Sequence, residues 1–331
     1  MSTPIRLGTR RSALAQAQSG HVAAALEKVA GRPVELVPIT SEGDTNRASL
    51  SEIGGQGIFA TRLREALLAG ECDFLVHSLK DLPTAIPEGL VIAATPERED
   101  ARDVVITRGG TPLHELRTGS TVGTGSPRRI AQVRRRAPHA QVVDLRGNVD
   151  SRLARVASGE LDAVILAAAG LSRLGTDSPL RREELGLAEW PTAPGQGALA
   201  IETRTDAPAE LLAALAALDH EPTRIAISVE RGVLEGLDAG CQAPMAAHAQ
   251  VEGSSIRIRT VVYAPDGGRR IGLDVTETLD EEYIRRNGSG NGADAADGAG
   301  PIPAARSLGL TLAHRLLDHG AADLVPREQS S

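Results

Sequence analysis

The sequence predicts an α/β protein with two similar lobes and a smaller α+β domain. From residue 5 to about residue 168, short β-branched runs alternate with amphipathic stretches, as in chains whose strands and helices alternate. A second unit of this kind begins near Glu99, after Pro96, and ends near Trp190. At 331 residues the chain is also too long for one ordinary core, so several domains are expected.

The elements of the two lobes follow from apolar runs bounded by turn residues. The first helix, over residues 12–30, has clear limits because Ser12 can cap it, Gly31 can end it and Pro33 prevents its continuation. Further helices are expected over 58–69 and 128–136. Strands are expected over residues 5–7, 34–39, 74–77, 91–94, 104–107, 142–145 and 164–168.

The last third of the chain has a different character. A helical Ala/Leu stretch at 210–218 precedes strands at 255–264 and 271–276, and a helix over 304–319 closes the chain. Residues 287–303 are rich in Gly, Ala, Asp and Asn, which predicts a mobile loop without chemistry. These elements indicate a smaller α+β domain.

Composition excludes several classes of protein. A net charge of -7 argues against general nucleic-acid binding, and no apolar run approaches the roughly 18 residues of a membrane span. The first residues lack the pattern of a signal peptide, so a cytoplasmic location is expected. Two distant cysteines, Cys72 and Cys241, suit neither a disulfide framework nor a metal cluster.

Arginines recur where predicted strands end and helices begin. Arg10 and Ser12 follow the first strand, and later strand ends carry the rest of the set: Ser126, Arg128, Arg129, Arg146, Arg152 and Arg173. Each arginine alone is most simply a solvated helix-start residue. As a set on two lobes, they favour a ligand with several negative groups, a polycarboxylate or a polyphosphate.

Three further positions could take part in chemistry. Asp81 follows Lys80 at a strand end and could stabilise a proton on a nitrogen-containing substrate, although a surface turn is equally compatible. His77 is interpreted as a satisfied, partly buried histidine, and Cys72 as a small buried apolar residue. Cys241, between Gly240 and Pro244, is the better candidate for a reactive thiol.

Seven segments, in this order and spacing, resemble the porphobilinogen deaminase (hydroxymethylbilane synthase) family. They are Thr9-Arg10-Arg11-Ser12, Gly54-Gly55-Gln56-Gly57-Ile58-Phe59, Val76-His77-Ser78-Leu79-Lys80-Asp81-Leu82-Pro83, Gly125-Ser126-Pro127-Arg128-Arg129, Leu145-Arg146-Gly147-Asn148-Val149, Gly195-Gln196-Gly197 and Gly240-Cys241-Gln242-Ala243-Pro244. Gln56 stands where many members of the family have lysine.

The resemblance implies two lobes like those of periplasmic solute-binding proteins, with doubly wound mixed sheets and the active site in the cleft between them. Domain 1 would comprise residues 1–96 with 195–215, since the chain crosses back to it. Domain 2 would comprise 99–191, and domain 3, which carries the cofactor cysteine, 219–331.

The resemblance also implies an activity and a cofactor. Four porphobilinogen molecules would be joined head to tail, with release of ammonia, into the linear tetrapyrrole hydroxymethylbilane for haem biosynthesis. The chain would grow on one dipyrromethane primer bound through a thioether to Cys241. The protein would be a monomer whose partners are porphobilinogen and polypyrrole intermediates, with no nucleic acid, membrane or metal.

Residue roles come from the same resemblance. Asp81 would be catalytic. Lys80, Ser78, Ser126, Arg128, Arg129 and Arg146 would bind the cofactor, and Arg10, Ser12, Gln18, Phe59, Arg152, Arg173 and Gln196 the substrate.

Two other classes of protein compete with this interpretation. A two-lobed protein that only binds polyanions or carboxylates would use the same arginines, but it would need neither Cys241 nor Asp81. A phosphoryl-transfer enzyme would need a Gly-Lys-Ser/Thr phosphate loop, which the sequence lacks.

Overall fold

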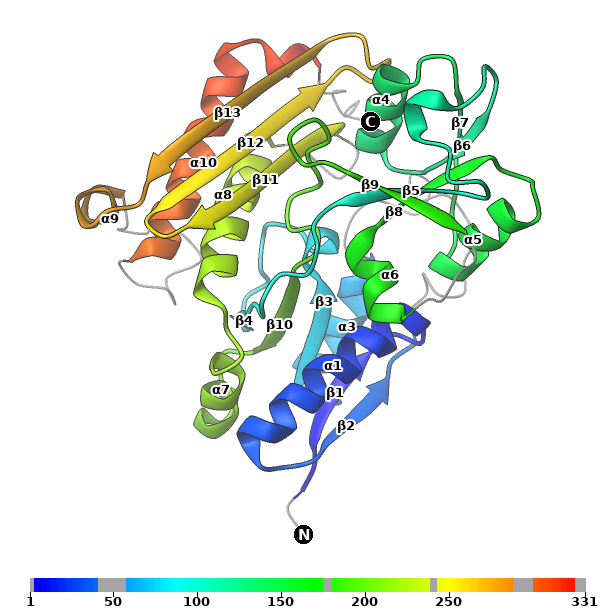
Figure 1. Cartoon of the computed structure of the whole chain (residues 1–331). Coiled ribbons are helices and arrows are strands. Elements are labelled where there is room, and N and C mark those ends of the chain that lie inside the picture. Colours follow the sequence, from blue (N-terminus) through cyan, green and yellow to red (C-terminus); the bar gives the residue numbers. More distant parts are fainter. Residues whose placement is uncertain (1–2, 41–57, 176–179, 239–242, 288–299, 325–331) are drawn as a thin grey trace, which may run out of the picture. The chain divides into compact units, whose positions relative to one another are not determined.

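The computed structural model describes residues 3–40, 58–175, 180–238, 243–287 and 300–324 (Figure 1). The chain divides into two compact units. The first contains Met1–Glu99 and Gly197–Arg224, and the second contains Asp100–Gln196 and Ile225–Ser331.

The described strands of the first unit form a mixed five-stranded sheet in the order β2-β1-β3-β10-β4. The strands are β1 (Ile5–Thr9), β2 (Val34–Pro38), β3 (Phe74–Ser78), β4 (Leu90–Ala94) and β10 (Leu199–Arg204). β1 is parallel to β2 and β3, whereas β10 is antiparallel to both of its neighbours. β10 therefore lies between β3 and β4 in this sheet, although the whole of a second α/β sheet separates it from them in the sequence.

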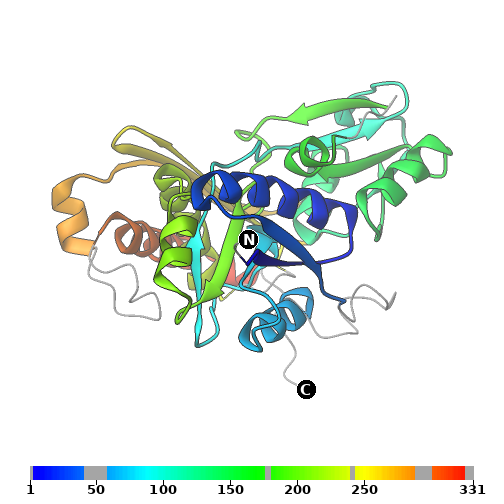
Figure 2. The ribbon, with the colours of Figure 1, turned by 90° about the horizontal axis from the view of Figure 1, so that it is seen from below.

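Helices cover both faces of the first sheet. α1 (Ala13–Ala30) and α7 (Ala209–Ala216) share one apolar cluster with β1, β3 and β10, while α3 (Ile58–Leu68) belongs to another cluster with β3. Figure 2 shows α1 and α3 on opposite sides of the strands. The limits predicted for α1 are confirmed, because Ser12 accepts from Ala15 N and Gly31 adopts the left-handed conformation. The first unit is a three-layer α/β lobe.

The second unit contains a sheet of similar plan, in the order β7-β6-β8-β5-β9 among the described strands. The strands are β5 (Asp103–Thr107), β6 (Thr121–Gly123), β7 (Gln141–Val143), β8 (Ala163–Ala167) and β9 (Arg181–Leu185). Again three parallel strands are followed by an antiparallel one, β5. α5 (Val149–Ala157) and α6 (Ala168–Leu174) pack in one apolar cluster, and α4 (Pro127–Arg136) in another.

The second unit also contains a three-stranded antiparallel sheet in the described range, ordered β11-β12-β13. Its strands are β11 (Met245–Glu252), β12 (Ser255–Tyr263) and β13 (Arg270–Thr278). α8 (Glu221–Gly236) and α10 (Pro301–Asp318) supply the apolar side chains that pack against it, and α9 (Glu281–Asn287) contacts α10. The predicted fold class, two α/β lobes with mixed sheets and a smaller α+β part, is confirmed.

Some predicted boundaries were wrong. Residues 144–145 lie beyond the end of β7, and the last helix begins at Pro301. Most of the loop predicted over 287–303 lies outside the described residues. Its two ends are helical, because Asn287 closes α9 and Pro301 opens α10.

Candidate functional site

The carboxyl ends of β1 and β3 meet at one edge of the first sheet, since these strands are parallel neighbours. Five predicted site residues belong to this edge: Arg10, Ser12, Ser78, Lys80 and Asp81. Arg10 and Ser12 follow β1, Ser78 is the last residue of β3, and Lys80 and Asp81 belong to the 3₁₀ turn that follows it. Ligands of α/β proteins gather at such edges.

Hydrogen bonds order this edge. Oγ of Ser78 lies 3.0 Å from Nε2 and 3.2 Å from Oε1 of the buried Gln18, so β3 is joined to α1. Ser19 Oγ donates to Thr9 Oγ1 at 2.8 Å, which joins α1 to β1. Two residues predicted to bind different molecules, Ser78 and Gln18, thus contact each other directly.

Asp81 is exposed, whereas the neighbouring Lys80 is half-buried. An exposed carboxylate beside an ammonium group can accept hydrogen bonds from an incoming ligand. The alternative of a surface turn has the same local geometry, so the catalytic role of Asp81 stays a prediction.

The same lobe contains a buried carboxylate that was not predicted from the sequence. Glu202, on β10, is fully buried and accepts two-point hydrogen bonds from Arg64 of α3 at 2.8–3.1 Å. His77 Nε2 lies 3.2 Å from Glu202 Oε2, so the prediction that His77 is a satisfied histidine is confirmed. Burial opposes ionisation of Glu202, but hydrogen bonds from His77 and Arg64 outweigh it and keep the pKa of Glu202 below its ordinary value.

In the second unit, α4 begins directly after β6 and carries two arginines that point inward. Ser126 caps this helix by accepting from Arg129 N at 3.5 Å, and Pro127 occupies its first turn. Arg128 and Arg129 are 3% and 7% exposed. The alternative of solvated helix-start residues is therefore excluded for these two.

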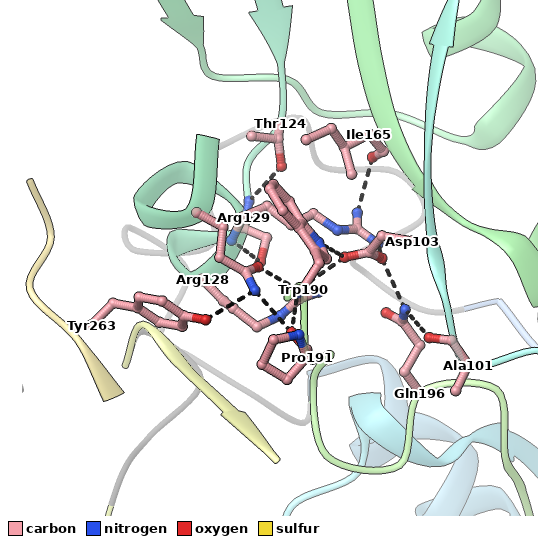
Figure 3. Close-up of polar contacts among 12 residues, drawn as sticks. Ala101, Asp103, Thr124, Arg128, Arg129, Ile165, Trp190, Pro191, Gln196 and Tyr263 are labelled. Carbon is pink, nitrogen blue, oxygen red and sulfur yellow. Dashed lines mark hydrogen bonds and ion pairs between the residues drawn. The ribbon is translucent and has the colours of Figure 1, made fainter. Parts of the chain in front are cut away.

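Both arginines pair with Asp103, the first residue of β5 (Figure 3). Asp103 also accepts from Trp190 Nε1 at 2.9 Å and from Gln196 Nε2 at 2.8 Å. Burial alone would raise the pKa of this carboxyl, but the charges of Arg128 and Arg129 hold the pKa of Asp103 far below its ordinary value. Asp103 is thus ionised at the centre of the network, and no local pattern in the sequence indicated its role.

The remaining predicted arginines of the second unit follow β7 and β8 in the sequence. Arg146 is exposed and lies 3.6 Å from Asp144, while Arg152, in α5, donates to Gly147 O at 2.8 Å. Arg173 is half-buried in the last turn of α6. Since β6, β7 and β8 are parallel, these arginines and Ser126 follow strand ends on one edge of their sheet.

Three predicted positions cannot be placed in the site. Cys241 and Gln56 lie outside the described residues, and so does the side chain of Phe59, whose backbone belongs to α3.

A pocket of about 460 Å³ in the first unit contains none of the predicted site residues. Its lining comes from the start of β1, the end of α1 and α7: Ile5, Val29, Ala30, Arg32, Glu210, Leu211, Ala213 and Ala214. Ile5 and Thr9 lie at opposite ends of β1, so this pocket is at the other edge of the sheet from Asp81.

An acidic cofactor fits the donors of the second unit. Arg128 and Arg129 share a single acid, Asp103, so the three side chains carry one excess positive charge. Nε of both arginines is buried without a hydrogen-bond partner among the described residues. Buried unpaired donors and unbalanced charge are unfavourable, and a carboxylate would relieve both.

Neither a cluster of metal ligands nor a membrane-spanning helix is found among the described residues. No group of three or more His, Cys, Asp or Glu side chains within the described ranges could hold a metal ion. None of the helices in those ranges has the length and hydropathy of a membrane-spanning segment.

Comparison with known proteins gives matches along nearly the whole chain. The profile described as "Porphobilinogen deaminase, dipyromethane cofactor binding domain" matches residues 5–211, and "Porphobilinogen deaminase, C-terminal domain" matches residues 224–318. The porphobilinogen deaminase of Leifsonia xyli subsp. xyli is 48% identical over 325 residues, which are 97% of this chain and 94% of that protein. Porphobilinogen deaminase 1 of Streptomyces coelicolor is 49% identical over 334 residues, 97% of each protein.

Among solved structures, an ancestral cationic amino acid solute-binding protein is similar, with a TM-score of 0.42 and 17% identity. That likeness covers 65% of this chain and 87% of the other. The two profiles and the relatives, by contrast, agree on one family over nearly every described element. The chain therefore belongs to the porphobilinogen deaminase family.

Proposed function

We propose that this protein is a porphobilinogen deaminase, a transferase that condenses four porphobilinogen molecules head to tail and releases ammonia. The match to the cofactor-binding profile over residues 5–211 carries this proposal. The geometry supports it, because an exposed acid and two sets of anion-binding donors lie at strand ends of the two lobes.

In this proposal Asp81 is the catalytic residue. Loss of ammonia from porphobilinogen leaves an electrophilic methylene carbon and a pyrrole that carries positive charge. The exposed carboxylate of Asp81 accepts a hydrogen bond from the pyrrole N–H and stabilises that charge while the next bond forms. The half-buried Lys80 beside it pairs with a ligand carboxylate.

The other donors hold the acetate and propionate groups. Those proposed to bind the cofactor are Ser78, Lys80, Ser126, Arg128, Arg129 and Arg146. Those proposed to bind substrate are Arg10, Ser12, Gln18, Phe59, Arg152, Arg173 and Gln196. Gln18 and Gln196 would act through the residues that they already contact, Ser78 and Asp103.

A dipyrromethane bound to Cys241 through a thioether would supply the growing end to which substrate is added. The chain would act as a monomer in the cytoplasm. Its domains would comprise residues 1–96 with 195–215, residues 99–191 and residues 219–331. The pairing of β10 with β3 and β4 supports the return of the chain to domain 1.

The deciding experiment is the intact mass of the purified protein beside its Cys241→Ser variant. We expect a mass excess of two pyrrole units in the wild type and the bare chain mass in the variant. A wild-type mass equal to the bare chain, unchanged after incubation with porphobilinogen, would leave only a binding protein for polyanions.

The Asp81→Ala variant tests the catalytic role. It should fold and lose turnover of porphobilinogen by at least about a hundredfold, the loss typical of removing a general acid or base. Asp206→Ala is the matched control, since Asp206 is exposed and follows β10 at the opposite edge of the same sheet. Normal turnover by Asp81→Ala would remove Asp81 from the mechanism.

A further inference from the structure

Asp103 accepts three hydrogen bonds and forms an ion pair with Arg128, so each carboxylate oxygen has two contacts. Oδ1 lies 2.6 Å from Arg129 Nη2 and 2.8 Å from Gln196 Nε2. Oδ2 lies 2.9 Å from both Arg128 Nη1 and Trp190 Nε1. These contacts enclose the carboxylate and Asp103 is fully buried, so it does not bind a ligand directly. Its action must be on the residues that surround it (Figure 3).

The network fixes the two arginines from several sides. Arg129 Nη1 also donates to Ile165 O at 3.0 Å, and Arg128 Nη1 donates to Gln132 Oε1 at 2.7 Å and to Pro191 O at 3.3 Å. With Asp103 at the centre, neither guanidinium group can turn without breaking an ion pair inside the protein. The negative charge of Asp103 neutralises one of the two positive charges of Arg128 and Arg129. One positive charge remains, and it matches the negative charge of one ligand carboxylate.

We propose that Asp103 is a positioning residue that sets the arrangement and the net charge of Arg128 and Arg129 for one pyrrole carboxylate. This inference rests on the proposed function, because that carboxylate belongs to the dipyrromethane. Trp190 is the one tryptophan of the sequence and donates to Asp103, so its fluorescence reports directly on the network.

The experiment compares four proteins: wild type, Asp103→Asn, Asp103→Glu and Asp274→Asn. Asp103→Asn removes the charge, and Asp103→Glu keeps it but moves the carboxylate by one methylene. Asp274 is the matched control because it also pairs with two arginines, Arg257 and Arg259, but is 47% exposed in β13. Circular dichroism establishes which variants fold.

Anion exchange separates protein without the cofactor from protein with it, because the cofactor adds negative charge. Two quantities are then measured on the protein without the cofactor. The first is the rate at which mass is gained during incubation with porphobilinogen. We expect both Asp103 variants to gain mass about tenfold more slowly or worse, and Asp274→Asn to match the wild type. The second is the emission of Trp190, which should change in the wild type as mass is gained and stay constant in Asp103→Asn.

If Asp103 had only a structural role, the emission of Trp190 would not depend on whether the cofactor is bound. Wild-type rates of mass gain in either folded Asp103 variant would overturn the inference. So would Trp190 emission that is unchanged by loading in the wild type, a result that requires no variant to fold. If the wild type itself gains no mass, the proposed function fails instead.

Discussion

Glu202 balances buried positive charge in the first lobe. Its carboxylate is the buried partner of Arg64, which is 8% exposed, and it also contacts His77. The Glu202→Gln variant would leave the Arg64 guanidinium buried without a counter-charge. We expect it to lower the free energy of unfolding by about 3–5 kcal/mol, measured by urea denaturation.

Asp206→Asn provides the comparison for that measurement. Asp206 pairs with Arg204 at 3.3 Å, but its side chain is 83% exposed. An exposed pair contributes about 0–1 kcal/mol. Equal losses in both variants would show that the burial of Glu202 has no special importance.

Cys72 should be chemically silent in the folded protein. Burial raises the pKa of its thiol to about 11, and the side chain is fully buried in the first lobe. Even without the effect of burial on access, only about one molecule in a thousand would be thiolate at pH 8. In the Cys241→Ser variant, a thiol reagent should therefore label nothing until denaturant is added, and then one cysteine. Labelling of the native variant would contradict this.

At the scale of elements, α8 and α10 approach each other through glycines. A Cβ on Gly309 would lie 2.2 Å from Val229 O and 2.9 Å from Gly232 Cα. Since these are backbone atoms, Gly309→Ala must push the helices apart, and we expect a loss of roughly 1–3 kcal/mol. Thermal unfolding measures it.

Gly20→Ala is the control, because it is also in a helix, α1, but nothing lies within 4 Å of the added carbon. That variant should be unchanged or more stable by up to about 1 kcal/mol. A Gly309→Ala variant that behaves like Gly20→Ala would show that the helices can separate without loss.

Elements with a buried apolar face were predictable from the sequence, and others were not. β1, β3 and β8 each consist mostly of buried apolar residues and were found within one or two residues. β9 was missed because four of its five residues are charged, as suits a strand at the edge of its sheet. β2 and β4 also lie at sheet edges, but they keep apolar runs and were predicted.

The candidate site shows the same limit. Strand-end arginines could be found from their spacing, but a partner distant in sequence could not. Asp103 meets Arg128 only because β5 lies beside β8 and α4 packs over them, and Glu202 meets Arg64 only because β10 returns to the first sheet. The local sequence therefore indicates where charged residues cluster, but only the fold shows which residue of opposite charge pairs with each of them.

The two buried acids make stability of the whole molecule depend on pH. Folding lowers the pKa of both Asp103 and Glu202 below their ordinary values of 3.8 and 4.5. Their contribution to the free energy of unfolding is complete above those pH values. It is lost as the pH falls below them, because the two carboxylates then bind protons in the unfolded chain but not in the folded chain. We expect the free energy of unfolding to be level near neutral pH and to fall steeply below about pH 4.5.

Urea denaturation between pH 3 and pH 7 measures this dependence. Glu202→Gln should show a shallower acid decline, by up to about 1.4 kcal/mol per pH unit, the effect of one proton. An acid decline that is identical in the variant and the wild type would exclude Glu202 as a source of the dependence.

The position of β10 constrains the order in which the protein can fold during synthesis. A nascent chain that ends at residue 196 contains β3 and β4 but not the strand that lies between them. Both strands then expose unpaired edges, and Arg64 has no Glu202. The second α/β sheet, in contrast, is complete once β9 has been made. The lobe that leaves the ribosome first is therefore expected to finish folding after the lobe that follows it, the reverse of the usual order for successive domains.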